Sequence, residues 1–233
     1  MESNVFPERY GYVSLVGRGS CALVYEVEDR LLGRRRAFKV GHHALSRQKK
    51  FLARWRREIV LYSQLVHPSI VPLYDHGSLS DGRPFVVLGL ASGGAMDTRL
   101  AEGVAIGELL GWIRQTLQAL ACMHSHGIYH QDVKPENVLI TGAGDAWLAD
   151  MSVARTRSEL RSSPREISGT FGWMSPEQQL QRARGIGPWS DLYSIGRILE
   201  QACSSLQEPR PLEEVVAGFV ELDPLRRPRL AWD

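Results

Sequence analysis

The change from strand-like to helical spacing of apolar residues along the chain constrains the fold more than any other feature of the sequence. Segments rich in β-branched and aromatic residues dominate roughly the first 90 residues, interrupted by one amphipathic stretch with helical spacing at residues 45–65. Beyond Gly93-Gly94 the apolar residues recur mostly at helical spacing. We therefore expect an α+β protein with a β-rich N-terminal lobe, about 1–90, and a mostly helical lobe, about 91–233.

The individual elements follow from apolar spacing and from the position of turn residues. Strands at 12–16 and 23–27 flank a glycine-rich turn and are expected to form a hairpin. The polar segment 156–168 has few apolar side chains and is expected to be mobile. Further strands are expected at 36–40, 70–74, 84–90, 137–140 and 146–149, and helices at 45–65, 108–126, 175–182, 191–202 and 212–221.

Composition excludes several classes of protein. A chain of 233 residues can bury a substantial core, and its 43% hydrophobic and 23% charged residues are ordinary for a globular protein. The formal charge of +2 argues against a dedicated nucleic-acid binder, and no apolar run approaches the roughly 20 residues of a membrane span. Residues 1–4 lack signal-peptide features, and the three cysteines are scattered without metal-ligand spacing. We expect a cytoplasmic protein with reduced thiols.

The segment His130–Ile140 carries the densest set of chemical groups. Asp132 is followed by Lys134 and Asn137 at offsets of two and five, directly before an apolar strand-like run. Asp132 can accept a proton from a hydroxyl, Lys134 can neutralise a neighbouring charge, and Asn137 can offer an amide oxygen to Mg²⁺. These are also common loop residues, so the segment indicates phosphate chemistry only if the rest of the chain supplies a nucleotide site.

Two N-terminal features could supply that site. In Gly17–Ala22 the glycines would let the backbone bring N–H groups close to phosphate oxygens, although glycines close many ordinary β-turns as well. Lys39 lies among apolar neighbours in an expected strand, where a buried ammonium needs an anion. Glu58 is a plausible partner on the amphipathic helix; the alternative places it on a solvated face with its arginine neighbours.

Asp150 ends the short apolar run that begins at Ala146. A carboxylate at the end of a buried strand, thirteen residues after Asn137, could share a Mg²⁺ ion with that amide. The alternative is that Asp150 only caps the strand.

The order and spacing of these motifs resemble the eukaryotic-type (Hanks-type) protein serine/threonine kinase family, from about Tyr10 to Arg229. Gly169–Glu177 is similar to the family's segment that ends in Ala-Pro-Glu, and Ser190–Gly196 resembles its central C-lobe helix. Asp223–Pro228 is similar to its late Asp-Pro-x-x-Arg-Pro motif. The resemblance implies a single bilobal, protein-kinase-like catalytic domain over residues 1–233.

The resemblance also implies a role for each polar residue. Lys39 would hold the α- and β-phosphates of ATP, and Glu58 would position Lys39. Asp132 would orient and deprotonate the acceptor hydroxyl, and Lys134 would steady the transferring γ-phosphate. Thr170 would bridge to Asp132, as in the Ser/Thr branch of the family.

Metal and adenine contacts are implied in the same way. Asn137 and Asp150 would bind Mg²⁺, with Mn²⁺ as an alternative ion. Gly17 and Gly19 of the glycine-rich turn would contact the phosphates. The side chains of Val24, Ala37 and Leu139 would enclose adenine. Backbone groups of Gly89 and Ala91 would bond the edge of the base, and Leu88 would act as gatekeeper.

Several residues depart from the family pattern. Ala22 replaces the third glycine of the turn, and Met151-Ser152 replaces Phe-Gly, where serine is expected to restrict the backbone. Gln131 replaces an arginine that pairs with a phosphorylated activation loop, so we hypothesise activity without loop phosphorylation. Only 50 residues separate Glu177 from Arg227, which are expected to form a structural ion pair, so the C-lobe is expected to be trimmed.

The favoured function is an ATP- and Mg²⁺-dependent kinase that phosphorylates Ser/Thr hydroxyls of protein substrates. A nucleotide-binding pseudokinase that acts as a scaffold or allosteric partner is the alternative, and a small-molecule kinase of related fold is a third. The complete ionisable set favours catalysis. We expect protein substrates, no nucleic acid partner and no membrane span, in the cytoplasm or in a host cytosol if the protein is a delivered effector. The sequence does not indicate an oligomeric state.

Overall fold

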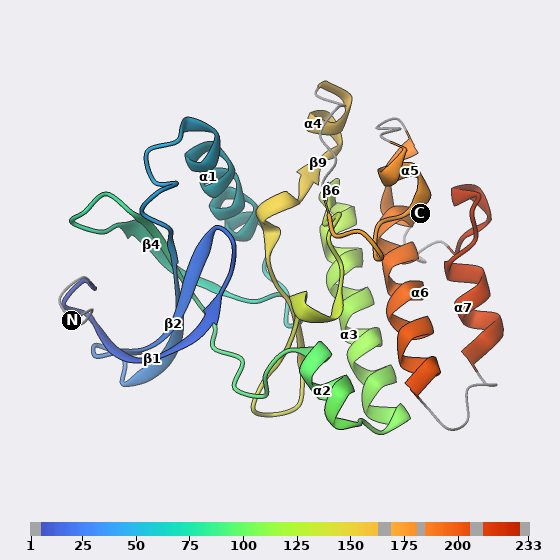
Figure 1. Cartoon of the computed structure of the whole chain (residues 1–233), viewed down its shortest axis with the longest axis horizontal. Helices are drawn as coiled ribbons and strands as arrows, with labels where there is room; N and C mark the ends of the chain where they lie inside the picture. The colour runs from blue at the N-terminus through green and yellow to red at the C-terminus, as the bar shows by residue number, and fades with distance from the viewer. Residues whose placement is uncertain (1–5, 163–168, 181–184, 206–211, 229–233) are drawn as a thin grey trace. The chain divides into compact units, whose positions relative to one another are not determined.

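The chain divides into two compact units (Figure 1). Unit 1 comprises Met1–Val66 and Ile70–Ser92, and unit 2 comprises His67–Ser69 and Gly93–Asp233. The computed structural model describes residues 6–162, 169–180, 185–205 and 212–228.

Unit 1 is built on an antiparallel five-stranded sheet with the strand order β1-β2-β3-β5-β4. Side chains alternate between the two faces of a strand. Tyr25 and Phe38, which pair across β2 and β3, are buried in an aromatic core, whereas Ala37 and Lys39 lie on the opposite face. The strands are β1 (Tyr10–Arg18), β2 (Ala22–Asp29), β3 (Arg34–Gly41), β4 (Leu73–Ser78) and β5 (Pro84–Leu88).

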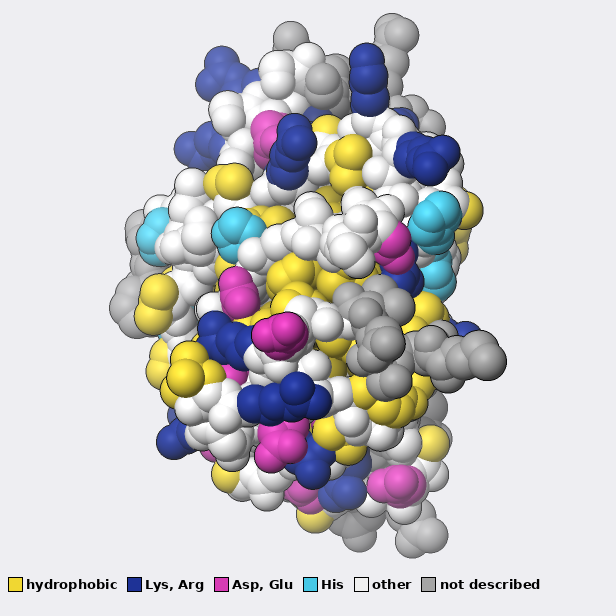
Figure 2. Space-filling model, turned by 90° about the vertical axis from the view of Figure 1, so that its left-hand side faces the viewer, with side chains coloured by type: hydrophobic (Ala, Val, Ile, Leu, Met, Phe, Trp, Pro, Cys, Tyr) yellow, Lys and Arg dark blue, Asp and Glu magenta, His cyan; other side chains and the backbone are white. Residues whose placement is uncertain are grey.

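Helix α1 (Lys49–Gln64) packs against β4 and β5 of this sheet. Its first turn contains two lysines and no acidic residue, which leaves the helix dipole uncompensated. The helix is therefore stabilised by the side that it buries, which includes Trp55, Glu58 and Leu61 at helical spacing. Figure 2 shows Lys and Arg side chains gathered over the upper part of one face of the molecule, with acidic and basic side chains mixed below them.

Unit 2 is mainly helical. Helix α3 buries a face that includes Leu109, Trp112 and Leu120, and it packs on α6, which in turn packs on α7 (Figure 1). The α6–α7 contact is close because Gly196 has no side chain: a Cβ there would lie 2.6 Å from the Cβ of Phe219. The helices are α2 (Met96–Glu102), α3 (Ile106–Ser125), α4 (Arg157–Ser162), α5 (Pro176–Gln179), α6 (Pro188–Ser205) and α7 (Glu213–Phe219).

Two small antiparallel ladders complete unit 2 and bring its polar segments together. Strand β6 (Ile128–Tyr129) pairs with β9 (Arg155–Thr156), and β7 (Val138–Ile140) pairs with β8 (Ala146–Leu148). The Ala149 amide also donates to the Asn137 carbonyl at 2.9 Å. As a result, the ends of β6, β7 and β8 lie close together. Short 3₁₀ turns occupy Pro135–Asn137, Met151–Val153 and Pro224–Arg226.

The predicted α+β fold class is confirmed, but some elements differ from expectation. Helix α2 was not predicted, and β4 begins at Leu73, three residues later than expected, after the buried Ile70 and Val71. The segment expected to be mobile forms β9 and α4 over its first part, and residues 163–168 lie outside the described residues. Within the described ranges, none of the helices is long and apolar enough to cross a membrane.

Candidate active site

Lys39 and Glu58 form an ion pair inside unit 1. The Lys39 Nζ lies 2.7 Å from Glu58 Oε1, and the side chains are only 15% and 4% exposed. The Lys39 Nζ also lies 5.7 Å from the centre of the Trp55 ring, one helical turn before Glu58. The alternative of a solvated Glu58 is therefore wrong, because the helix turns this carboxylate toward the strand that carries Lys39.

The glycine-rich turn joins β1 to β2. Gly19 N–H donates to the Ala22 carbonyl at 2.9 Å, and neither Gly17 nor Gly19 has a positive φ. A Cβ at either glycine would make only ordinary contacts, 3.6 Å from Val24 at Gly17 and 3.5 Å from the Ala22 oxygen at Gly19. The turn itself therefore does not require these glycines. Ala22 lies in regular β-strand, so its replacement of a glycine causes no backbone strain.

The predicted adenine contacts are divided between the two units. Ala37 pairs with Leu88 across β3 and β5, on the face of the sheet that also carries Val24 and Lys39. The Gly89 N–H donates to the Pro72 carbonyl at 2.9 Å, so the Gly89 carbonyl is the backbone group left to accept a hydrogen bond from a ligand. Ala91 follows the last strand of unit 1, and Leu139 lies on β7 of unit 2.

Asp132 is the centre of a hydrogen-bond network in unit 2. Thr170 Oγ1 donates to Asp132 Oδ1 at 2.7 Å, and Asn137 Nδ2 donates to Asp132 Oδ2 at 3.1 Å and to its backbone carbonyl at 2.8 Å. Lys134 Nζ lies 3.2 Å from Asp132 Oδ2 and donates to Thr170 Oγ1 at 2.7 Å. The expected bridge from Thr170 to Asp132 is present, and both carboxylate oxygens have defined partners.

Asn137 and Asp150 offer oxygen atoms that suit a hard cation. Because Asn137 Nδ2 is turned to Asp132, its Oδ1 is the outward atom, and this oxygen accepts no hydrogen bond within the described part of the chain. Asp150 has a left-handed backbone, φ 63°, and its Oδ1 accepts from Ser152 N–H at 3.3 Å. An amide oxygen and a carboxylate fit Mg²⁺, which takes one or two protein ligands and completes its shell with water and phosphate.

Comparison with known proteins identifies the family. The protein kinase domain family matches residues 10–211, which is most of the chain. The chain belongs to the protein kinase family. Its similarity to bacterial serine/threonine kinases, described next, places it in the Hanks-type serine/threonine branch.

Three of these relatives are typical. The chain is 36% identical over 205 residues to the DNA damage-responsive serine/threonine-protein kinase RqkA of Deinococcus radiodurans, covering 84% of the chain and 30% of that protein. It is 32% identical over 199 residues to the probable kinase PknB of Lactococcus lactis, covering 84% and 31%. It is 35% identical over 200 residues to PknL of Mycobacterium tuberculosis, covering 84% and 49%. The chain thus spans between about 30% and about half of the length of these relatives.

A buried carboxylate holds the backbone of His130 and Gln131, directly before Asp132. Asp191, at the start of α6, is 0% exposed and accepts the backbone N–H groups of His130 at 3.0 Å and Gln131 at 2.8 Å. The ring of His124 lies 2.8 Å from the same carboxylate. Burial alone would raise the pKa of Asp191, but the His124 bond and the other donors outweigh burial and lower that pKa. The sequence analysis did not predict this role of Asp191. The signal in the sequence was a single acidic residue at the start of an apolar helix.

Gln131 is held in a left-handed conformation with φ 65°. Its carbonyl accepts from Gln178 Nε2 at 2.9 Å, and its side-chain amide donates to the Val153 carbonyl at a long 3.5 Å. Met151, which replaces the family's phenylalanine, is fully buried. Ser152, which was expected to restrict the backbone, lies in a 3₁₀ turn without a positive φ, and the positive φ falls on Asp150 instead.

Glu177 and Arg227 form the structural ion pair that the sequence predicted. Arg227 donates to Glu177 through two nitrogens, at 2.7 and 3.0 Å, and Ser190 Oγ donates to the same carboxylate at 2.8 Å. Both partners are buried, so the pair ties α5 to the segment after α7. Two bonds in parallel make the geometry specific as well as strong.

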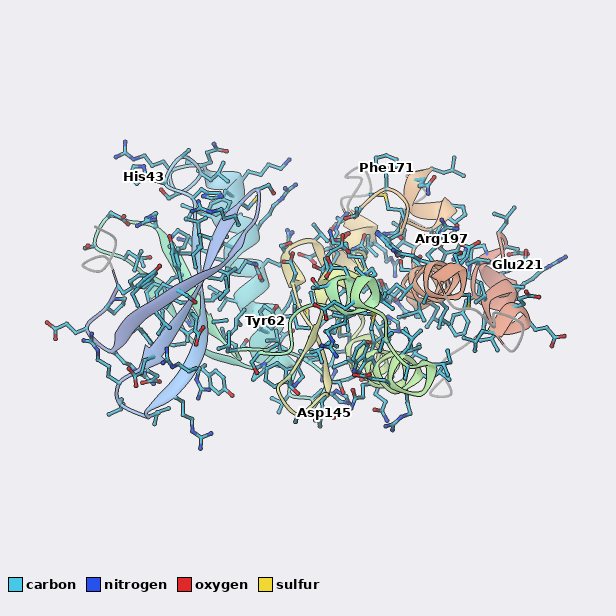
Figure 3. The ribbon with its side chains drawn as sticks, turned by 60° about the horizontal axis from the view of Figure 1, so that its bottom comes forward. His43, Tyr62, Asp145, Phe171, Arg197 and Glu221 are labelled. Carbon is cyan, nitrogen blue, oxygen red and sulfur yellow. The ribbon has the colours of Figure 1, made fainter. Side chains whose placement is uncertain are left out.

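The arginines that follow Asp150 are placed in different environments. Arg155 is buried and donates to the Glu159 carbonyl at 2.7 Å. Arg157 and Arg161 line an open hollow beside the end of α3 that contains none of the predicted site residues. Arg165 lies outside the described residues. Phe171, labelled in Figure 3, is 73% exposed directly after Thr170.

Proposed function

We propose that the chain is the single catalytic domain of an ATP- and Mg²⁺-dependent kinase that transfers the γ-phosphoryl group of ATP to Ser or Thr hydroxyls of protein substrates. The observation that carries this proposal is the network around Asp132, in which Thr170, Asn137 and Lys134 leave the carboxylate oriented and partly buried. This arrangement suits phosphoryl transfer, which needs a base held in a fixed orientation and a cation beside it that can neutralise phosphate charge.

Asp132 would act as the base for the acceptor hydroxyl. Asn137 and Lys134 both approach Oδ2, whereas Oδ1 accepts from Thr170 alone, so Oδ1 keeps a lone pair for a further hydrogen bond. The substrate hydroxyl gives its proton to Asp132 as its oxygen bonds to the γ-phosphorus, and the bond from phosphorus to the bridging oxygen of ADP breaks. Lys134 would balance the negative charge of the transferring group.

The unit 1 residues would hold the nucleotide. Lys39 would contact the α- and β-phosphates while Glu58 keeps its ammonium oriented, which removes the freedom of a long side chain. Val24, Ala37 and Leu88 would supply the apolar contacts of adenine, together with Leu139. The carbonyl of Gly89 and the backbone of Ala91 would bond the edge of the base. The amides of the glycine-rich turn would face the phosphates.

Asn137 and Asp150 would hold the divalent cation, Mg²⁺ or Mn²⁺. The ion supplies charge neutralisation for the phosphate oxygens when it is bound. Asn137 is prepared for this by its bonds to Asp132, which orient the amide so that oxygen and not nitrogen faces outward. We also propose a cytoplasmic location and activity that is independent of activation-loop phosphorylation.

The deciding experiment measures phosphoryl transfer from γ-labelled ATP with Mg²⁺ to the chain itself and to a generic basic protein. We expect transfer by the wild type and a rate about 10³-fold lower for Asp132→Asn, which keeps the size of the side chain but is not a base. Asp145→Asn is the matched control, because Asp145 is an exposed acid of the same unit. ATP binding without transfer in the wild type would favour the pseudokinase alternative.

A further inference from the structure

His42 contacts the glycine-rich turn twice. It follows Gly41 at the end of β3, and its backbone N–H donates to the Cys21 carbonyl at 3.0 Å. Its ring Nε2 lies 2.8 Å from the carbonyl oxygen of Gly19. A carbonyl oxygen can only accept, so Nε2 carries the hydrogen in this contact. Two carbonyls of the turn, those of Gly19 and Cys21, therefore bond to this one residue.

The bond to Gly19 also sets the direction of a donor. The Gly19 carbonyl and the Ser20 N–H belong to one planar trans peptide unit, in which the two groups point in opposite directions. With the carbonyl directed at His42, the Ser20 N–H is directed away from it. In the described residues, the N–H groups of Ser20 and Cys21 donate no hydrogen bond, whereas that of Gly19 is used by Ala22.

His42 follows a strand end that is held in place by close packing. Ala22 pairs with Gly41 across β2 and β3, and a Cβ at Gly41 would lie 2.8 Å from the Phe51 ring of α1, so the strand end is closely packed. The turn, in contrast, has glycines at 17 and 19 whose backbone has little intrinsic restraint. Among the described residues, the bond from His42 is the one hydrogen bond made by the Gly19–Ser20 peptide unit itself, so this contact is the main restraint on its orientation.

We propose that His42 is a positioning residue that aims the Ser20 amide N–H at the phosphates of the nucleotide. This inference rests on the proposed function, because it assumes that the turn covers a phosphate chain. His42 lies three residues after Lys39, directly beyond the end of β3, so this strand would carry one phosphate contact itself and orient a second through the residue that follows it. Pre-orientation of a donor lowers the entropic cost of binding.

A series of side chains of graded length tests this proposal. In His42→Gln the amide nitrogen takes the place of Nε2, whereas in His42→Asn the amide stops at the place of Nδ1 and falls short of Gly19. We expect the affinity for ATP to fall about tenfold in His42→Asn and to stay within about threefold of the wild type in His42→Gln. Isothermal titration of each variant with ATP and with adenosine provides the measurement.

Adenosine separates positioning from a structural defect, since it lacks phosphates. We expect its affinity to be unchanged in all variants, with an unchanged melting temperature. His43→Asn is the matched control: His43 is the exposed neighbour in the turn between β3 and α1 (Figure 3), and its replacement should leave ATP binding unaltered. Equal losses of ATP and adenosine affinity in His42→Asn, or no loss of ATP affinity, would overturn the proposal.

These binding measurements do not depend on catalysis. A wild-type chain that binds ATP without transferring phosphate would contradict the proposed function, yet the ATP-to-adenosine ratio of the His42 variants would still support or refute the positioning role.

Discussion

The two units hold their charged side chains in different ways. In unit 1 the Lys39–Glu58 pair joins a strand to a helix, so any displacement of α1 relative to β3 separates the two charges. In unit 2 Asp132 is bonded within its own loop by Asn137 and from a later segment by Thr170. The position of Asp132 is therefore fixed largely within its own loop, whereas the position of Lys39 depends on the packing of one helix.

The supports also differ in burial. The carboxylate of Asp191 is completely buried and carries the backbone of the loop, while the Lys39 side chain keeps 15% of its surface exposed. A completely buried charge is costly to leave unpaired, and a partly exposed one can be hydrated. We therefore expect mutations of the unit 2 support to act on stability and mutations of the unit 1 pair to act on activity.

Asp191→Ala should have the largest effect. It leaves two backbone N–H groups and His124 without their acceptor, and we expect a loss of roughly 3–5 kcal/mol in the free energy of unfolding of unit 2. Urea denaturation followed by hydrogen exchange of peptides from each unit measures this loss. Asp145→Ala, which removes an exposed acid, should cost less than about 1 kcal/mol. Equal losses of stability in Asp191→Ala and Asp145→Ala would contradict the expectation that the buried support of unit 2 acts on stability.

The same carboxylate predicts a dependence on pH. Because the folded pKa of Asp191 is lowered, its contribution is present above the unfolded value of about 3.9 and is lost as the pH falls through the lower folded value. Wild-type unit 2 should lose stability on acidification below about pH 4, and Asp191→Ala should show a smaller slope over that range. Denaturation midpoints measured between about pH 5 and about pH 2.5 test the sign of this dependence of stability on pH.

Lys39→Met should be the next largest effect, and it should be one on activity. Removal of the ammonium is expected to lower kcat/KM by about 10²–10³-fold, because a charge aimed at the phosphates is lost. The melting temperature should fall less than in Asp191→Ala, although the buried Glu58 loses its ion-pair partner. Lys49→Met is the control, since Lys49 is exposed on the same helix that carries Glu58. Unchanged transfer in Lys39→Met would show that the phosphate site is misassigned.

Thr170→Val should have a smaller effect on the base itself. It removes the hydroxyl that donates to Asp132 and accepts from Lys134, and we expect kcat to fall about 10–100-fold with KM for ATP little changed. Thr170→Ser keeps the hydroxyl and should retain most of the activity. A rise in KM without a change in kcat would place Thr170 in nucleotide binding instead.

Phosphatase treatment should have the smallest effect. Gln131 offers a neutral amide where the family pattern has an arginine, and its amide faces the Val153 carbonyl, so the loop has no cation at this position to pair with a phosphate. We expect kcat within about twofold of the untreated enzyme. A large loss on treatment, reproduced by mutation of a mapped loop site, would contradict this expectation.

Sequence periodicity predicted the hairpin, α1 and α3 because each has enough apolar residues to establish a period. It missed α2, which has seven residues, and the pairing of β6 with β9, whose strands have two residues each. Elements this short are stabilised by their neighbours and carry little pattern of their own. The polar α4 was missed for the same reason, since it buries only Leu160.

The candidate site was predicted where motif spacing defines it, as at Asp132, Lys134 and Asn137. The supporting contacts could not be predicted, because they join residues far apart in the chain with no pattern between them. Asp191 reaches a loop about 60 residues away, and the contact from His42 to Gly19 depends on the path of a turn.

The scarcity of lysine gives the chain its own set of chemical probes. Only four of its 28 basic residues are lysines, and Lys134 is the sole one in unit 2. Lys39 and Lys134 are shielded, with 15% and 19% of their side chains exposed, while Lys49 and Lys50 lie on the surface. Amine acylation should modify the surface pair quickly and the shielded pair slowly. The acylation rate of Lys39 relative to the surface lysines would report on the ion pair of unit 1, and that of Lys134 would report on the ion pair of unit 2. Neither measurement needs an engineered label.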